Sequence, residues 1–145
     1  MSYTAAQQAA VASNVAAVRG NVGKHAQDFF VFWLKNSPGE ISKFPNYKGK
    51  TADTLSSVSQ FAKHSKDVVE DLLAFVEIAH DSGALKAKAA NHMKTHASRN
   101  LSGSDYDSLF ASLIPFLEKT LGGGCATDGW QNATALVGDA IKAQM

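Results

Sequence analysis

Apolar residues recur along most of this chain with the spacing of α-helices, and alternating runs typical of β-strands are scarce. Glycines, prolines and short polar clusters divide this pattern into segments. Pro38 would lie in the first turn of a short helix, whereas Pro115 lies inside a pattern that it should kink or shift. The predicted helices cover residues 4–19, 22–36, 38–44, 51–79, 84–97, 105–121 and 128–142, with an irregular corner at 45–50. The pattern therefore predicts an all-α protein of seven or eight helices.

The composition restricts the class of protein further. A length of 145 residues predicts a single domain, residues 1–145. With 14 basic and 13 acidic residues the net charge is +1, so we expect no nucleic-acid partner. The hydrophobic fraction of 45% and charged fraction of 19% argue against disorder. Cys125 is the only cysteine, which excludes an internal disulfide and a cysteine-cluster zinc module.

The sequence carries no signal for export or membrane insertion. Residues 1–20 are rich in alanine but lack the basic start and apolar centre of a secretory signal. No stretch approaches the ~20 apolar residues that cross a bilayer. We therefore expect a cytoplasmic protein without a membrane partner. Cys125 or an exposed apolar face could support a weak homodimer, so monomer and dimer both stay open.

His64 stands out among the five histidines because of its neighbours. On a helical projection Phe61, Val68, Leu72 and Phe75 all lie within roughly 80° of it. A titratable ring on an apolar stripe costs free energy unless it finds a partner. His64 is then either a core histidine bonded to a backbone carbonyl or a ligand or proton donor that points into a cavity.

His92 and His96 are four residues apart and therefore share one helical face. This spacing permits two metal contacts, but the zinc-protease motif requires Glu after the first His, where Met93 stands here. No carboxylate nearby in the sequence completes a small metal site. It stays open that one of these two histidines is a metal ligand and the other is only its neighbour.

The remaining candidates favour structural roles. The glycines at 122–124 lack the Lys-Ser/Thr pair of a phosphate loop, and Cys125 has no base beside it in sequence. Acidic residues of the long predicted helix indicate a solvated face: Asp67, Glu70 and Asp71. Aromatic residues at helical spacing indicate core: Phe29, Phe30, Trp33 and Phe44.

Taken together, these features resemble the globin family over nearly the whole chain. The resemblance is carried by FFVFWLKNSPGEISKFPNYKGK, QFAKHSKDVVEDLL, NHMKTHASRNL and the helix around Trp130. Pro38 matches the start of the short third helix, Phe44 follows six residues later, His64 twenty after that, and His96 a further 32. Within the family the sequence is most similar to invertebrate single-chain myoglobins, and most of all to the dehaloperoxidase type. His92 departs from the pattern, because many globins have an apolar residue one turn before the iron ligand.

The resemblance implies a globin fold that encloses haem b. His96 would be the iron ligand, and His64 would face the open coordination position as a ligand-stabilising or acid/base group. Exchanged roles for His64 and His96, or His92 as the ligand, stay open. The pocket would be lined by Phe30, Phe44, Tyr47, Val68, Met93, Leu101 and Leu109.

Four functions are compatible with these residues. The favoured one is reversible binding of O₂, or another small diatomic ligand, for storage or facilitated diffusion. The alternative is a peroxidase that oxidises small halogenated phenols, with His64 as acid and base. It is disfavoured because no carboxylate stands where peroxidases strengthen the iron ligand. A sensor with His64 itself on the iron, or a helical interaction module without haem, completes the set.

Overall fold

The computed structural model describes residues 2–145 and contains six α-helices, with no strand within that range. The α-helices are α1 (Ala5–Arg19), α2 (Val22–Asn36), α3 (Phe61–Glu77), α4 (Ser82–His96), α5 (Gly103–Leu121) and α6 (Thr127–Lys142). The 3-10 segments are η1 (Pro38–Lys43), η2 (Pro45–Tyr47), η3 (Ala52–Ser57), η4 (Ala97–Arg99) and η5 (Gly122–Gly124). The predicted all-α class is confirmed, and the six α-helices with the two six-residue 3-10 segments make up the predicted eight helices. No helix among the described residues is both long and apolar enough to cross a membrane.

Local capping fixes several helix starts. Thr4 and Gln7 form a capping box at α1, in which each side chain bonds the other's backbone N–H at 3.1–3.2 Å. At α4, the Asp81 carboxylate accepts from the backbone N–H of Ala84 at 3.0 Å. This cap lets α4 begin at Ser82, two residues before the predicted start.

The predicted helix over 51–79 is wrong as one continuous element. Residues 52–57 form η3, Val58 is extended with ψ 123°, and α3 begins only at Phe61. The break follows from the hydroxyl-rich sequence, because Ser and Thr side chains compete for backbone groups. Here the Ser57 hydroxyl donates to the Thr54 carbonyl at 2.6 Å, within a segment that Thr51 caps.

Two other predictions near prolines are refined. The corner at 45–50 contains the 3-10 turn η2, so it is less irregular than expected. Pro115 lies in the interior of α5, which continues to Leu121. Its side chain is exposed, and α5 ends at Leu121 as predicted, so no boundary is shifted.

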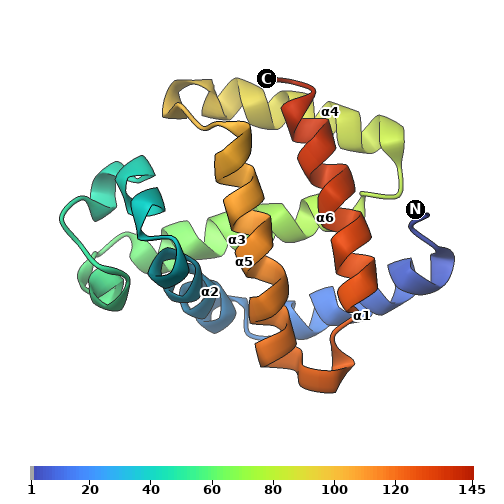
Figure 1. The fold of residues 1–145 in the computed structure, drawn as a ribbon, viewed down its shortest axis with the longest axis horizontal. Coiled ribbons are helices and arrows are strands. Elements are labelled where there is room, and N and C mark those ends of the chain that lie inside the picture. Colours follow the sequence, from blue (N-terminus) through green and yellow to red (C-terminus); the bar gives the residue numbers. More distant parts are fainter. Residues whose placement is uncertain (1) are drawn as a thin grey trace.

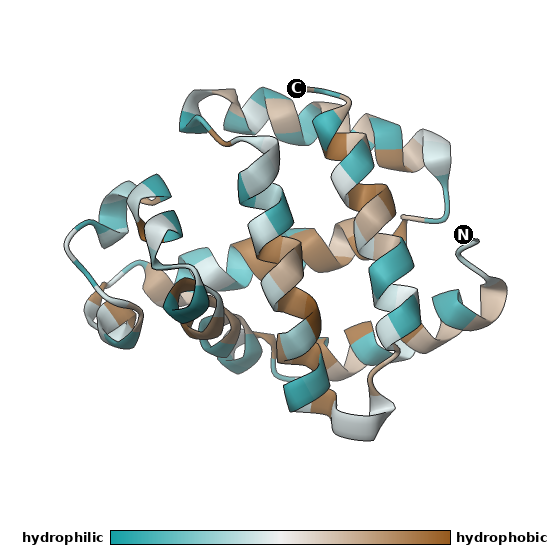
Figure 2. Ribbon diagram, viewed as in Figure 1, coloured by the Kyte–Doolittle hydropathy of each residue, from teal (hydrophilic) through white to brown (hydrophobic). Residues whose placement is uncertain are grey.

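The helices cross in layers, as Figure 1 shows, with α5 and α6 side by side over α3 and with α4 along one end of α6. Hydrophobic residues gather where these helices cross (Figure 2). The core includes the fully buried rings of Trp130, Phe29 and Phe30. Each large apolar side chain that is withdrawn from water contributes ~1.5–3 kcal/mol, so these rings are a main source of stability.

Helices α1 and α6 approach unusually closely at Gly129. A Cβ at this position would lie 2.7 Å from the Val11 Cγ2 atom. Beside this crossing the buried Asn14 amide donates to the Gly124 carbonyl at 2.9 Å and accepts from Ala126 N and Trp130 Nε1 at 2.8 and 3.0 Å. One polar side chain therefore ties α1 to the start of α6.

Helices α3 and α4 form an antiparallel pair joined by the turn at 78–81, and their free ends point the same way (Figure 1). His64 lies 13 residues before the end of α3, and His96 lies 14 residues after the start of α4. At a rise of 1.5 Å per residue both histidines are ~20 Å from the turn. The two histidines therefore lie at about the same distance from the turn, one on each helix.

Candidate functional site

His96 is the last residue of α4, and its ring has a defined set of hydrogen-bond partners. Its Nδ1 lies 2.8 Å from the carbonyl oxygen of His92 and 2.9 Å from the Thr95 hydroxyl. Because a carbonyl only accepts, the proton of the neutral ring is on Nδ1. Burial, with a contribution from His92, lowers the pKa of His96 below its usual value. The ring is therefore neutral at pH 7 and keeps a lone pair on Nε2, the state that metal coordination requires.

His64 is held by aromatic side chains from α2 and from the segment between α2 and α3. Its ring centroid lies 5.7 Å from that of Phe30, 5.4 Å from Phe44 and 5.5 Å from Tyr47. Burial lowers the pKa of His64, and the positive charge of Arg99 lowers it further. His64 is thus also neutral at pH 7, with one donor and one acceptor nitrogen.

The hydrogen bond from Tyr47 fixes which nitrogen of His64 donates. The Tyr47 hydroxyl lies 2.6 Å from His64 Nδ1, and it has no other hydrogen bond among residues 2–145. Tyr47 is only 1% exposed, so its proton would be unsatisfied unless the hydroxyl is the donor. Burial raises the pKa of Tyr47 to about 12, so the proton stays in place. The His64 proton is therefore on Nε2, and that nitrogen is available as a donor.

The predicted lining residues divide into two groups. Phe30 and Tyr47 are buried and contact His64. The other five are apolar side chains that pack against the core yet keep partial exposure: Phe44, Val68, Met93, Leu101 and Leu109. They come from the segment after α2, from α3, from α4, from the loop before α5 and from α5 itself. Partly exposed apolar walls from five segments suit a flat hydrophobic ligand.

His92 belongs to a cluster that the spacing along the sequence does not indicate. Its Nε2 lies 2.8 Å from the Tyr106 hydroxyl, and its Nδ1 lies 3.5 Å from Asp71 Oδ2. Lys88 Nζ lies 2.8 Å from the other Asp71 oxygen. The His92 imidazole has the largest effect on the pKa of Asp71, and Lys88 acts in the same direction. Together they lower this pKa to about 2, although burial acts to raise it.

The prediction that Asp71 belongs to a solvated face is therefore only partly right, because its side chain is 43% exposed yet also pairs with groups on α4. Asp67 and Glu70 are exposed as predicted, and Asp67 pairs with Lys63 on the same helix at 2.6 Å. Asp71 instead turns toward α4, where Lys88 and His92 lie 17 and 21 residues further along the chain. A weak signal existed, since Asp71 follows His64 by seven residues and thus shares its side of the helix.

Both ring nitrogens of His92 face groups on α3 and α5, so the structure favours His96 as the nitrogen donor with a free lone pair. Within residues 2–145 no group of three or more His, Cys, Asp or Glu side chains could hold a metal ion.

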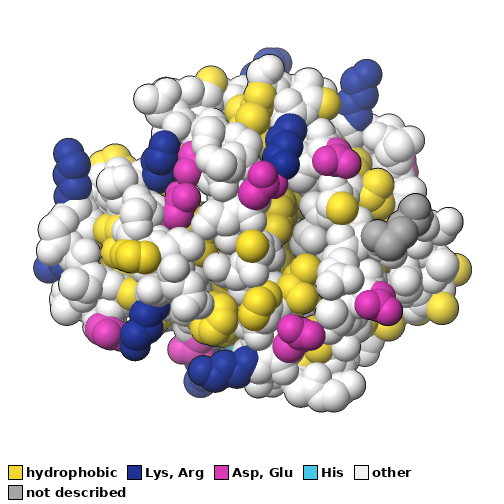
Figure 3. Space-filling view, in the orientation of Figure 1, with side chains coloured by type: hydrophobic (Ala, Val, Ile, Leu, Met, Phe, Trp, Pro, Cys, Tyr) yellow, Lys and Arg dark blue, Asp and Glu magenta, His cyan; other side chains and the backbone are white. Residues whose placement is uncertain are grey.

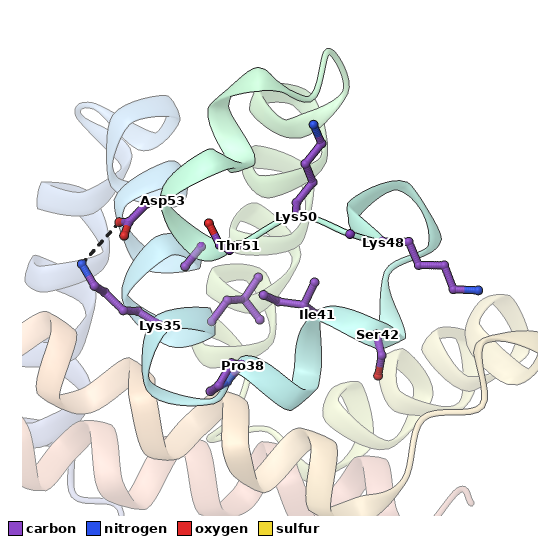
Figure 4. Close-up of a pocket in the computed structure, with 11 residues that line it drawn as sticks. Lys35, Pro38, Ile41, Ser42, Lys48, Lys50, Thr51 and Asp53 are labelled. Carbon is purple, nitrogen blue, oxygen red and sulfur yellow. Dashed lines mark hydrogen bonds and ion pairs between the residues drawn. The ribbon is translucent and has the colours of Figure 1, made fainter.

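Two surface pockets lie elsewhere on the molecule. One of about 480 Å³ has an apolar floor that includes Leu34 and Ile41. An ion pair lies at its edge, where Lys35 Nζ is 3.3 Å from Asp53 Oδ1 (Figure 4). The other, of about 350 Å³, lies between α5 and α6, where hydrophobic side chains gather in Figure 3. Neither is lined by a histidine, so neither is the predicted site.

A model of the globin family matches residues 27–145. The chain belongs to the globin family. It is 25% identical over 146 residues to a globin of Nerita albicilla, covering 99% of this chain and 93% of that protein. It is 27% identical over 141 residues to Globin-1 of Liolophura japonica, covering 97% and 89%.

Solved structures confirm the globin fold. Ferric Aplysia limacina myoglobin superimposes with a TM-score of 0.85 at 22% identity, covering 97% of each chain. The azide-bound ferric form gives a TM-score of 0.86 at 22% identity, covering 98% of each chain. The predicted similarity to invertebrate myoglobins is thereby confirmed. The closer similarity to the dehaloperoxidase type stays a prediction.

Proposed function

We propose that this globin holds one haem b through His96 and binds O₂ reversibly, with His64 stabilising the ligand. The observation that carries the proposal is the state of His96, whose Nδ1–H is tied to the His92 carbonyl while Nε2 keeps its lone pair. A neutral imidazole with its second nitrogen bonded to a carbonyl is the usual form of a metal-ligating histidine.

The described residues fit a haem in other respects as well. A porphyrin needs an apolar slot, and Phe44, Val68, Met93, Leu101 and Leu109 supply partly exposed apolar side chains around the two helices. Arg99 and Lys43 lie near the end of α4, where Lys43 donates to the Asn100 carbonyl at 3.3 Å. Cations at that rim suit the propionates at the edge of the porphyrin. A bound haem would supply the iron on which a diatomic ligand binds.

His64 determines how strongly that ligand is retained. Because Tyr47 donates to Nδ1, the Nε2–H of His64 is the group that can donate to a polarised diatomic ligand. A hydrogen bond to a group with charge contributes ~1.5–3 kcal/mol. At ~1.4 kcal/mol per decade this corresponds to roughly 10–150-fold slower loss of O₂.

Several finer predictions are part of this proposal. Storage or facilitated diffusion of O₂, the monomeric or weakly dimeric state and a cytoplasmic location stay predictions. The peroxidase alternative has no observation of this structure behind it, because the Asp71 carboxylate pairs with His92 and the His96 Nδ1 bonds a backbone carbonyl.

Absorbance spectroscopy tests the proposal. We expect the protein to take up one equivalent of haem, to show a Soret band, and to change spectrum reversibly when the ferrous form meets O₂. His64→Leu should release O₂ roughly 10–150-fold faster. His80→Leu, at an exposed position in the turn after α3, is the matched control and should match the wild type.

Two results would contradict the proposal. Absence of a Soret band after addition of haem would exclude haem binding altogether. A six-coordinate low-spin ferrous spectrum without added ligand would show that His64 occupies the iron, as in the sensor hypothesis.

A further inference from the structure

The ring of His92 lies flat against the ring of His96. Their centroids are 3.9 Å apart and their planes differ by 18°. The backbone carbonyl of the same residue, His92, accepts the His96 Nδ1–H bond. His92 therefore contacts His96 twice, once through its main chain and once through its imidazole face.

The side chain of His92 is itself immobilised from three directions. Tyr106 of α5 bonds its Nε2, and Asp71 of α3 faces its Nδ1. The edge of Phe75 packs against its ring with centroids 5.5 Å apart. Only 11% of the side chain is exposed. These contacts give the ring one defined plane.

The hydrogen-bond directions along this cluster are mutually consistent. A carboxylate accepts only, so the Asp71 side places the His92 proton on Nδ1. The His92 Nε2 then accepts from the Tyr106 hydroxyl. Lys88 completes the chain by donating to Asp71 and also lies 4.7 Å above the Phe75 ring. The two most buried members, His92 and Tyr106, thus both have polar partners, as buried polar groups require.

This anchoring matters because the ring torsion of a histidine is intrinsically loose. The χ2 angle of His has broad minima, so a single hydrogen bond at Nδ1 leaves the ring plane free to rock. A flat neighbour at 3.9 Å removes that freedom, provided that the neighbour is itself held.

We propose that His92 is a positioning residue that fixes the ring plane of His96 as iron ligand, anchored by Asp71 on one side and Tyr106 on the other. This inference rests on the proposed haem ligation by His96. Removal of a residue that contacts a metal ligand, but not the metal itself, commonly lowers the affinity for the metal by about 10–100-fold. The polar residue at 92, where many globins have an apolar one, thereby acquires a function.

Spectroscopy of the haem-loaded protein tests the ring plane directly. In the ferric cyanide complex, the pattern of haem-methyl NMR shifts reports the orientation of the axial imidazole plane. We expect His92→Leu to change this pattern and to raise the rate of haem loss to apomyoglobin about 10-fold. His92→Phe, which keeps a flat ring but loses both anchors, should lie between His92→Leu and the wild type.

The anchors are tested by Asp71→Ala and Tyr106→Phe, each of which should shift the methyl pattern in the same direction as His92→Leu. Asp67→Ala is the matched control, since it also removes an ion-paired aspartate from α3 but one that faces solvent. It should leave the pattern unchanged and haem loss within about two-fold of the wild type.

The outcomes separate the two proposals. If the wild type binds haem and His92→Leu keeps the wild-type methyl pattern and rate of haem loss, the positioning role is wrong and haem ligation stands. If Asp67→Ala shifts the pattern as much as Asp71→Ala, the effect is general to α3 and the role is again wrong. If the wild type binds no haem, both proposals fail.

Discussion

The Tyr47 hydroxyl donates a 2.6 Å hydrogen bond to Nδ1 of His64, a residue on a different helix. This bond links the 3-10 turn after Phe44 to the start of α3 and sets the tautomer of His64. The properties of His64 therefore depend on a residue outside its own helix.

Removal of the Tyr47 hydroxyl should leave the ring of His64 less firmly oriented. We expect Tyr47→Phe to speed O₂ dissociation about 2- to 12-fold, the equivalent of one hydrogen bond of ~0.5–1.5 kcal/mol. Stopped-flow O₂ dissociation measures this, and ¹⁵N NMR of labelled histidine should show His64 losing its single Nε2–H form. Tyr3→Phe, outside the site, is the control. An unchanged dissociation rate with an unchanged tautomer would contradict the assignment.

The α1–α6 crossing should be intolerant of one added methyl group. In Gly129→Ala the new Cβ would meet Val11 Cγ2 at 2.7 Å and the Gln7 carbonyl oxygen at 3.2 Å. Overpacking costs ~1–3 kcal/mol, and the better helix propensity of Ala offsets at most ~1 kcal/mol. We therefore expect a lower free energy of unfolding, measured by urea denaturation with circular dichroism.

Gly138→Ala provides a matched comparison within the same helix. Its Cβ would lie 3.7 Å from the Phe110 ring, an ordinary contact distance. The higher helix propensity of Ala should then not be offset by overpacking. The variant should be as stable as the wild type or up to ~1 kcal/mol more stable. If Gly129→Ala were as stable as Gly138→Ala, the close approach of α1 and α6 would be wrong.

Stability should fall as pH rises through the range set by Glu40. Burial, and after it the interaction with Asp105, raise the pKa of Glu40 to about 7. Because the folded-state pKa exceeds the unfolded value, the folded state binds this proton more tightly. The stabilisation is fully present below about pH 4.5 and is lost as pH rises to about 7.

Glu40→Gln should remove this dependence. The variant should match the wild type near pH 5 and exceed its free energy of unfolding by roughly 1 kcal/mol at pH 8, a value reduced for the partial exposure of Glu40. Urea denaturation at the two pH values measures this. Glu70→Gln, at an exposed position on α3, should show no such pH-dependent gain. Equal gains at pH 5 and pH 8 would rule out the raised pKa.

The elements that sequence alone could locate are those with local boundaries. Helix α2 was predicted at both ends, Val22 and Asn36, because Gly20 and Pro38 interrupt the pattern on either side. The single helix predicted over 51–79 failed because the break at Val58 depends on hydroxyl groups that bond to nearby backbone. Hydrophobic periodicity carries no information about that competition.

The site was predictable only in part for a related reason. His64, Phe44 and His96 could be proposed because their spacing along the chain is characteristic. The contact of Asp71 with His92 joins residues 21 positions apart on different helices, and it depends on how α3 and α4 pack. The Tyr47–His64 bond likewise arises from the path of the chain between α2 and α3.

The most direct test of haem ligation by His96 compares haem uptake by His96→Gly and His92→Gly. His96→Gly should lose stable haem binding and regain it when imidazole is added, because the cavity left by the side chain admits the free ligand. His92→Gly should still bind one equivalent of haem with the Soret band of the wild type. Normal haem binding by His96→Gly, together with its loss in His92→Gly, would show that the iron ligand has been assigned to the wrong histidine.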